Sequence, residues 1–348
     1  MEQAGVNFDR CDVEMVLLAG GGSDRSFYRV KTPEKSYIVM TDPRSNHEIR
    51  AYADVGRFLF ENGIGAPEII ACDGEKQLVL LEDLGDSSLY ALLKKAVNGE
   101  VVREYYKKVL IFLAEMQMKA SPAIETCEYL KHRSFGYEAF RWETDYFRER
   151  FIKQFCGIRI EKEGALEDEF HGLAATLSEE PRYFMHRDFQ SQNIYLTDGR
   201  VRVIDFQTAT RGLLQYDLAA LLKDAYFRLD RQERQGLLDF YMARLAEPWG
   251  LDVDQQRFLK TFHLTGLQRN MQALGAFAFL SLNKGKIEFM QHIPAALGSL
   301  KETLNMFPEY PMLRETVEKA EFSGKATTLR LFRHAQGKQA QGKKQKVR

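Results

Sequence analysis

The segment MHRDFQSQN (185–193), followed by VRVIDFQ (201–207), contains residue types that could transfer a phosphoryl group. Asp188 and Asn193 are separated by four residues, and Asp205 follows in the next apolar run. Phosphoryl transfer needs a carboxylate near the attacking hydroxyl and oxygen ligands for the metal ions that neutralise phosphate charge. Asp188 is therefore the candidate catalytic base, and Asn193 and Asp205 are candidate ligands for Mg²⁺.

Two short apolar strands are expected around these residues, IYL (194–196) and VRVID (201–205), joined by the turn TDGR. Such a hairpin would place Asn193 and Asp205 side by side. The spacing meets the protein-kinase pattern HRDxxxxN, while the second motif is Asp-Phe-Gln at 205–207 where kinases have Asp-Phe-Gly. We expect His186 to pack beneath this loop. The alternative is a hairpin whose Asp and Asn residues serve only as caps.

Upstream segments occur in the order that a kinase requires. A glycine-rich turn between two expected strands could bring backbone N–H groups to phosphates, although alone it would be an ordinary turn; it contains Gly20, Gly21, Gly22 and Ser23. Glu48 lies in an expected helix, 46–62, where kinases place the partner of their phosphate-binding lysine; a solvated helix residue is the alternative. LVLLEDLG (78–85) resembles a kinase hinge, so the backbone of Glu82 and Leu84 is expected to bind adenine, with the hinge at 82–86.

One kinase residue is missing. Met40 occupies the third expected strand, YIVMTDP, at the position of the kinase lysine, and a thioether cannot pair with phosphate oxygens. Another cation could replace the lysine, and the candidates are Arg25, Lys35 and Arg44. Alternatively the backbone and Mg²⁺ suffice, or the chain is a pseudokinase that binds nucleotide without turnover. The intact Asp188, Asn193 and Asp205 argue against the pseudokinase.

The acceptor is expected to be small. Eleven residues separate Asp205 from Asp217, and no Ala-Pro-Glu follows, so the long segment with which protein kinases hold a peptide is absent. Asp217 begins an apolar helix and is expected to brace the catalytic loop; an ordinary carboxylate at a helix N-terminus is the alternative.

Periodicity predicts the elements that position these residues. Apolar alternation over 13–42 and 68–83, interrupted by the helix 46–62, indicates a small sheet with one helix. Helical segments are expected at 101–116, 134–154, 163–178 and 215–282, with the 194–205 hairpin between the last two. The sequence thus predicts an α+β, protein-kinase-like fold with two lobes. We expect a β-rich N-lobe at 1–85, a larger helical C-lobe at 86–323 and a polar, disordered tail at 324–348.

Charge and cysteine content restrict the function classes. The tail carries eight basic residues and no acid; since the whole chain is neutral, residues 1–323 carry −8. This acidic body argues against nucleic acid as a partner. The four cysteines show no metal or disulfide spacing, and neither a secretory signal nor an apolar run of membrane-spanning length occurs. We expect a cytoplasmic protein without membrane insertion; the sequence indicates no oligomeric state.

These motifs resemble the aminoglycoside phosphotransferase-like kinase superfamily, which includes choline and homoserine kinases. Within it, the chain is most similar to bacterial anomeric kinases of N-acetylmuramate and N-acetylglucosamine, which act in cell-wall sugar recycling. The resemblance covers roughly residues 18–285 and is carried by GGGSDRSFYRV, IVMTDP, LLEDLGD, HRDFQSQN, VIDFQTATRGLLQYDLAALLKDAY and GLQRNMQALGAFAFLSLNKGK.

The resemblance implies ATP and Mg²⁺ as cofactors, with Asp188 as base and Asn193 and Asp205 as metal ligands. It also implies a pocket for the amino sugar, formed by Gln190, Arg211, Asp224, Gln268 and Arg269. For these five residues, solvated helix faces or helix caps are the alternative. An aminoglycoside, an amino alcohol or homoserine remains an alternative acceptor.

Overall fold

The computed structural model describes residues 13–18, 24–43 and 46–320 of the 348-residue chain. Internal contacts divide the chain into two compact units. The first contains the chain up to Phe135 together with Glu180–Phe262, and the second contains Gly136–Glu179 together with the residues from His263 onward. This division is based on contacts within the chain, and it separates the chain at positions other than residue 85. The lobe boundary that we expect at residue 85 therefore stays a prediction.

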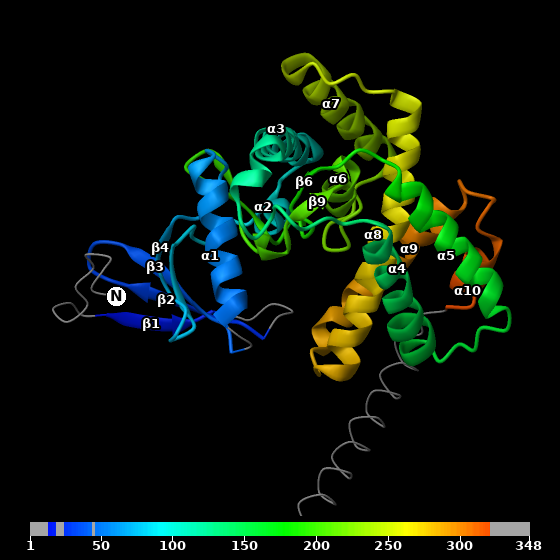
Figure 1. Ribbon diagram of the computed structural model, residues 1–348, viewed down its shortest axis with the longest axis horizontal. Helices are drawn as coiled ribbons and strands as arrows, with labels where there is room; N and C mark the ends of the chain where they lie inside the picture. Colours follow the sequence, from blue (N-terminus) through cyan, green and yellow to red (C-terminus); the bar gives the residue numbers. More distant parts are fainter. Residues whose placement is uncertain (1–12, 19–23, 44–45, 321–348) are drawn as a thin grey trace, which may run out of the picture. The chain divides into compact units, whose positions relative to one another are not determined.

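A five-stranded antiparallel sheet begins the first unit (Figure 1), with the strand order β1-β2-β3-β5-β4. Its strands are β1 (Glu14–Leu17), β2 (Ser26–Lys31), β3 (Ser36–Thr41), β4 (Ile69–Asp73) and β5 (Leu78–Glu82). In the register of the central strands, Met40 lies opposite Phe27 on β2 and Val79 on β5. The Met40 side chain is fully buried, so this position belongs to the apolar core.

The helix α1 (Asn46–Glu61) packs on this sheet through one apolar face (Figure 1). The buried residues of this face recur every three to four positions, as helical geometry requires: Ile49, Tyr52, Val55 and Leu59. A Cβ added at Gly56 would lie 2.7 Å from Ile69 Cδ1 on β4. Glycine therefore lets α1 approach the sheet closely, which positions the first turn of α1 and its Glu48 relative to the strands.

Helices and two short strand pairs complete the first unit. They are α2 (Leu89–Lys95), α3 (Gly99–Ala123), β6 (Tyr183–Met185), β7 (Ile194–Thr197), β8 (Arg200–Val203), β9 (Thr210–Gly212), α6 (Leu214–Leu222), α7 (Arg231–Trp249) and the beginning of α8 (Gln255–Asn283). β6 pairs with β9, and β7 pairs with β8. Asp198 and Gly199 turn the β7–β8 hairpin at φ values of 52° and 74°, as two-residue hairpins require.

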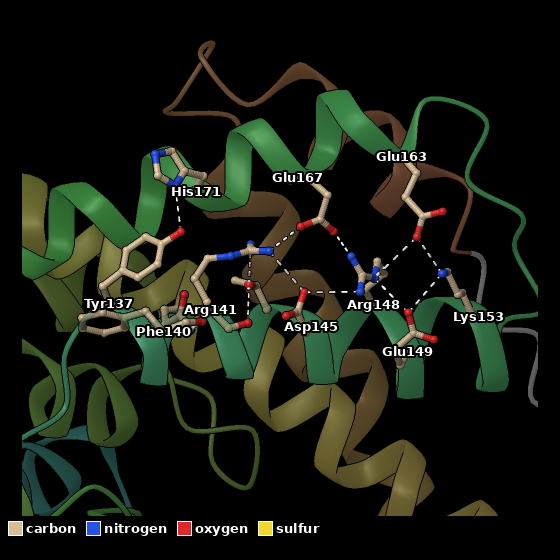
Figure 2. A network of polar contacts seen from close by, with 12 residues as sticks. Tyr137, Phe140, Arg141, Asp145, Arg148, Glu149, Lys153, Glu163, Glu167 and His171 are labelled. Atoms are coloured by element: carbon tan, nitrogen blue, oxygen red, sulfur yellow. Dashed lines mark hydrogen bonds and ion pairs between the residues drawn. The ribbon is translucent and has the colours of Figure 1, made fainter.

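The second unit is helical. It contains α4 (Tyr137–Tyr146), a π-helix that continues α4 (Phe147–Phe155), α5 (Glu163–Ser178), the end of α8, α9 (Ile293–Leu304) and α10 (Pro311–Glu318). Ion pairs connect α4 and its π-helical continuation to α5, including Arg141 and Arg148 with Glu167 and Lys153 Nζ with Glu163 Oε1 at 2.7 Å (Figure 2). Partly exposed ion pairs contribute little singly, and the π-helix also buries the aromatic side chains of Phe147, Phe151 and Phe155.

Several expected elements agree with the structure. The five strands of the first sheet, α1 and the β7–β8 hairpin lie where the apolar patterns predicted them. The patterns missed α2, β6 and β9, because three to seven residues are too few to establish a period. Within the described part of the chain, no helix combines the length and apolarity needed to cross a membrane.

Candidate active site

Asp188 lies on the loop between β6 and β7, and its neighbours hold both its backbone and its carboxylate. Thr208 Oγ1 donates a hydrogen bond to Asp188 Oδ2 at 2.9 Å. Asn193 Nδ2 donates to the Asp188 backbone carbonyl at 3.0 Å. These bonds orient the candidate base before any ligand binds.

Asp205 follows β8 in the left-handed backbone region, at φ 65°. Its Oδ1 accepts hydrogen bonds from Gln207 Nε2 at 2.9 Å and from Arg25 Nη1 at 3.3 Å. The N–H of Ile204 donates to the Asn193 carbonyl at 3.0 Å. The hairpin thus brings Asn193 and Asp205, the two expected metal ligands, to the same end of β7 and β8.

Two buried carboxylates hold the catalytic loop. Asp217, at the start of α6 and 0% exposed, accepts from the N–H of His186 and the N–H of Arg187, each at 2.8 Å. Arg187 has φ 77°, a conformation that costs a non-glycine residue on the order of 1 kcal/mol. Asp224 accepts from Ser191 N–H at 2.9 Å and from Ser191 Oγ at 2.6 Å. The bracing expected of Asp217 is therefore present in these bonds, and Asp224 braces the loop as well.

His186 lies beneath the loop, edge-on to Phe189 with ring centroids 5.8 Å apart. Its side chain is fully buried. Burial lowers the pKa of His186 from 6.5 to about 4, against the opposing effect of the nearby Asp188. The imidazole is therefore neutral at pH 7.

Arg25 lies among three carboxylates at the end of the sheet. Its Nε donates to Asp42 Oδ2 at 3.0 Å, its Nη1 is 3.3 Å from Asp205 Oδ1, and its Nη2 is 3.7 Å from Glu48 Oε2. The guanidinium carbon is 5.8 Å from the centre of the Tyr52 ring. Burial, together with Asp205, raises the pKa of Tyr52 far above its usual value, so the phenol stays protonated.

The other candidate cations lie elsewhere. Lys35 is in the turn before β3, with Nζ 4.8 Å from the centre of the Tyr37 ring. Asp42 follows the opposite end of this strand, and six strand residues span about 20 Å. Arg44 lies outside the described residues, as do Gly20, Gly21, Gly22, Ser23 and the basic tail.

The expected hinge carries ion pairs on both sides. Glu82 pairs with Arg202, whose Nη1 is 3.2 Å from Glu82 Oε1. Arg29 Nε is 2.7 Å from Asp83 Oδ2. Burial would raise the pKa of Asp83, but hydrogen bonds from the Gly85 N–H, from Ser36 and from Arg29 hold it below its ordinary value. The Leu84 carbonyl accepts from Thr197 Oγ1 at 2.8 Å. The hinge backbone is therefore held in place from both the sheet and the β7–β8 hairpin.

The expected acceptor residues fall into both units and differ in environment. Gln190 is half-buried on the catalytic loop, and its side chain makes no hydrogen bond within the described part of the chain. Arg211, on β9, pairs with Glu125. In the second unit, Gln268 is 0% exposed and donates to the Phe140 carbonyl at 2.8 Å and to Glu143 Oε2 at 3.1 Å.

Arg269, also in the second unit, donates to Gln272 one turn further along α8. The geometry of Gln268 and Asp224 favours a structural role for each. Of the five residues, only the side chain of Gln190 is both close to the candidate base in sequence and uncommitted within the described residues.

Sequence reasoning missed three residues that contact the candidate catalytic groups: Asp42, Gln207 and Thr208. Gln207 and Thr208 directly follow Asp205 and Phe206, where the kinase motif has its glycine. The departure from Asp-Phe-Gly was itself the available signal, because a polar side chain at that point can bond to the motif's own aspartate. Asp42 gave no such signal, since its importance depends on a partner that is 17 residues away.

Comparisons with known proteins agree with this geometry. Residues 14–249 match the family described as "Phosphotransferase enzyme family". An N-acetylmuramate/N-acetylglucosamine kinase of Neisseria meningitidis serogroup B is 27% identical over 315 residues, covering 88% of this chain and 91% of that protein. A protein of the same name from Pseudomonas aeruginosa is 25% identical over 307 residues, covering 87% of each chain.

Solved structures show the same architecture. Choline kinase from Cryptosporidium parvum Iowa II superposes with a TM-score of 0.62 at 13% identity, covering 89% of this chain and 94% of that one. At this identity the likeness concerns the fold alone. It confirms the protein-kinase-like fold predicted from the sequence.

Proposed function

This chain belongs to the phosphotransferase enzyme family, and we propose that it transfers the γ-phosphoryl group of ATP to a hydroxyl of N-acetylmuramate or N-acetylglucosamine. The acceptor oxygen would attack the γ-phosphorus, the bond to the bridging oxygen would break, and ADP would leave with that oxygen. The acceptor's proton would pass to Asp188. We further propose the anomeric hydroxyl as the attacking group, in line with the sugar kinases that the sequence resembles.

The observation that carries the proposal is the constraint on Asp188. Thr208 Oγ1 at 2.9 Å holds one carboxylate oxygen, and Asn193 holds the backbone at 3.0 Å. A base that is fixed in this way loses little freedom when the acceptor binds, and such positioning supplies much of the catalysis in phosphoryl transfer. We infer that the second carboxylate oxygen faces the acceptor hydroxyl.

The donor set near Asp205 fits Mg²⁺. Within the described ranges, no cluster of three or more His, Cys, Asp or Glu residues could hold a metal ion by itself. Mg²⁺ is commonly bound by one or two protein oxygens together with phosphates and water, which is what Asn193 and Asp205 offer. When bound there, it would neutralise charge on the transferred phosphate.

The choice of acceptor rests on the two curated relatives, whose names specify N-acetylmuramate and N-acetylglucosamine. Both cover most of this chain. Gln190 is the residue that we propose to contact the sugar, because it follows Asp188 by two positions. The described cysteines, Cys72, Cys127 and Cys156, are free thiols, which supports a reducing compartment such as the cytoplasm.

The test is coupled ADP release with Mg-ATP against N-acetylmuramate, N-acetylglucosamine, other hexoses, kanamycin, choline and homoserine. Asp188→Asn should lower kcat by about 10²- to 10⁴-fold, the usual contribution of a general base. Asp198→Asn is the matched control: Asp198 is an exposed turn residue at φ 52°, a conformation that asparagine tolerates.

Turnover on an N-acetyl sugar that Asp188→Asn lowers to this extent and Asp198→Asn preserves would support the proposal. Phosphorus NMR of the product would then identify the phosphorylated oxygen. Turnover on kanamycin, choline or homoserine alone would refute the proposed acceptor while leaving the phosphotransferase chemistry intact.

A further inference from the structure

We propose that Arg25 binds the nucleotide phosphates in place of the lysine that Met40 replaces. This inference deepens the proposed function and depends on it for the identity of the donor. In protein kinases, a lysine on the third strand binds the α- and β-phosphates and is oriented by a glutamate on the first helix. Here the third-strand residue, Met40, is fully buried and cannot donate a hydrogen bond.

The contacts of Arg25 match those of that lysine. Its Nη2 is 3.7 Å from Glu48 Oε2, in the first turn of α1, and its Nη1 is 3.3 Å from Oδ1 of Asp205. The cation therefore lies between the helix glutamate and the candidate metal-binding aspartate. It reaches this position from the start of β2, on the strand next to the one that carries Met40.

The three carboxylates around the guanidinium differ in their exposure. The side chain of Asp42, which holds Nε, is 0% exposed. Those of Glu48 and Asp205, next to the two Nη atoms, are 34% and 39% exposed. Arg25, whose own side chain is only 3% exposed, is thus anchored through Nε in the interior, and its two Nη groups lie beside the two partly exposed carboxylates.

The donor count leaves room for a phosphate. A guanidinium has five N–H donors, and hydrogen bonds within the described residues use one to Asp42 and one to Asp205. The fork geometry of the remaining donors suits two phosphate oxygens. Three carboxylates outnumber this single cation, so the site favours a phosphate chain that arrives with a divalent cation over a free anion.

Nucleotide binding tests this assignment without any acceptor. Isothermal titration would compare Mg-ADP with adenosine, which lacks the phosphates. Arg25→Gln alone would remove the ion pair of the buried Asp42 carboxylate, and breaking a buried ion pair strongly destabilises proteins. The informative variant is therefore Arg25→Gln with Asp42→Asn, in which two amides replace the ion pair. The control is Lys31→Gln at the far end of β2, where an exposed lysine pairs with Glu14 at 3.2 Å.

We expect the double variant to bind Mg-ADP about 10- to 100-fold more weakly, the loss that corresponds to hydrogen bonds with a charged partner. Adenosine affinity should stay within about twofold, and Lys31→Gln should change neither affinity. A second variant, Arg25→Lys, keeps a cation for Asp42 but loses the fork, and should also weaken Mg-ADP selectively.

Unchanged Mg-ADP affinity in both Arg25 variants would overturn the assignment, as would an equal loss for adenosine and Mg-ADP. The second outcome would mean that Arg25 only supports the fold. A wild-type protein that binds Mg-ADP through Arg25 but phosphorylates no N-acetyl sugar would support the assignment and refute the proposed acceptor.

Discussion

Replacing His186 with leucine should remove a specific part of the pH dependence of stability. In the native protein, burial keeps the imidazole neutral down to about pH 4, the value to which the pKa of His186 falls. In the unfolded chain the same group has an ordinary pKa near 6.5. As pH falls below 6.5, His186 binds a proton in the unfolded state but not in the native state, so the free energy of unfolding decreases.

The magnitude follows from the difference between the two pKa values. One pKa unit corresponds to about 1.36 kcal/mol, so protonation of the unfolded state costs the native protein about 3 kcal/mol between pH 6.5 and pH 4. Below pH 4 the native imidazole also binds a proton, and this contribution levels off. Leucine has a similar volume, suits the contact with Phe189, and does not titrate.

The assay is urea unfolding of the wild type and His186→Leu at pH 7, 6, 5 and 4. Carboxylates with lowered native pKa values, such as Asp83, also destabilise both proteins as pH falls, so the informative quantity is the difference between the two. This difference should shift in favour of the variant by about 3 kcal/mol from pH 7 to pH 4. Parallel curves for the two proteins would refute the argument that His186 is buried in its neutral form.

Two further substitutions test other parts of the structure. Asp217→Asn places an amide N–H against one of the two backbone N–H donors, and we expect it to lower the free energy of unfolding by about 2–3 kcal/mol. It should also lower kcat in the ADP-release assay while Mg-ADP affinity stays within about twofold. An unchanged kcat would refute the bracing role of Asp217. Gly275→Ala would put a Cβ 2.7 Å from Tyr146 Cδ1, and should cost about 1–3 kcal/mol in thermal or urea unfolding. Gly236→Ala is its control, because no atom lies within 4 Å of the added Cβ; equal stability of the two alanine variants would contradict the close packing.

The sequence predicted the elements whose signals are local. The β7–β8 hairpin could be predicted because the turn TDGR separates two alternating apolar runs. Pairs of distant segments gave no such signal. β6 and β9 are three residues each, and Met185 pairs with Thr210 across the whole catalytic hairpin. Ser88 caps α2 through the N–H of Ala91 at 3.2 Å, but seven residues do not establish a helical period.

The candidate site likewise contains residues that could be predicted from local sequence and residues that could not. The spacing of Asp188, Asn193 and Asp205 was visible because one hairpin brings them together. The position of Arg25 was not, since its partner Asp205 is 180 residues away, and the sequence offered three possible cations with nothing to rank them. A role for Glu48 could be inferred only once the structure placed the guanidinium of Arg25 beside it.

The division into two units has a consequence for biosynthesis. Residues 136–179 leave the ribosome before the segments with which they pack, and the second unit also requires the chain after residue 262. Glu169 on α5, for example, accepts hydrogen bonds from the N–H groups of Met312 and Leu313 at 2.7 and 2.8 Å. At the usual pace of translation, α5 waits on the order of ten seconds for α10. During that interval the part of α5 that α10 covers in the folded protein lies open on the nascent chain, where a chaperone could bind it.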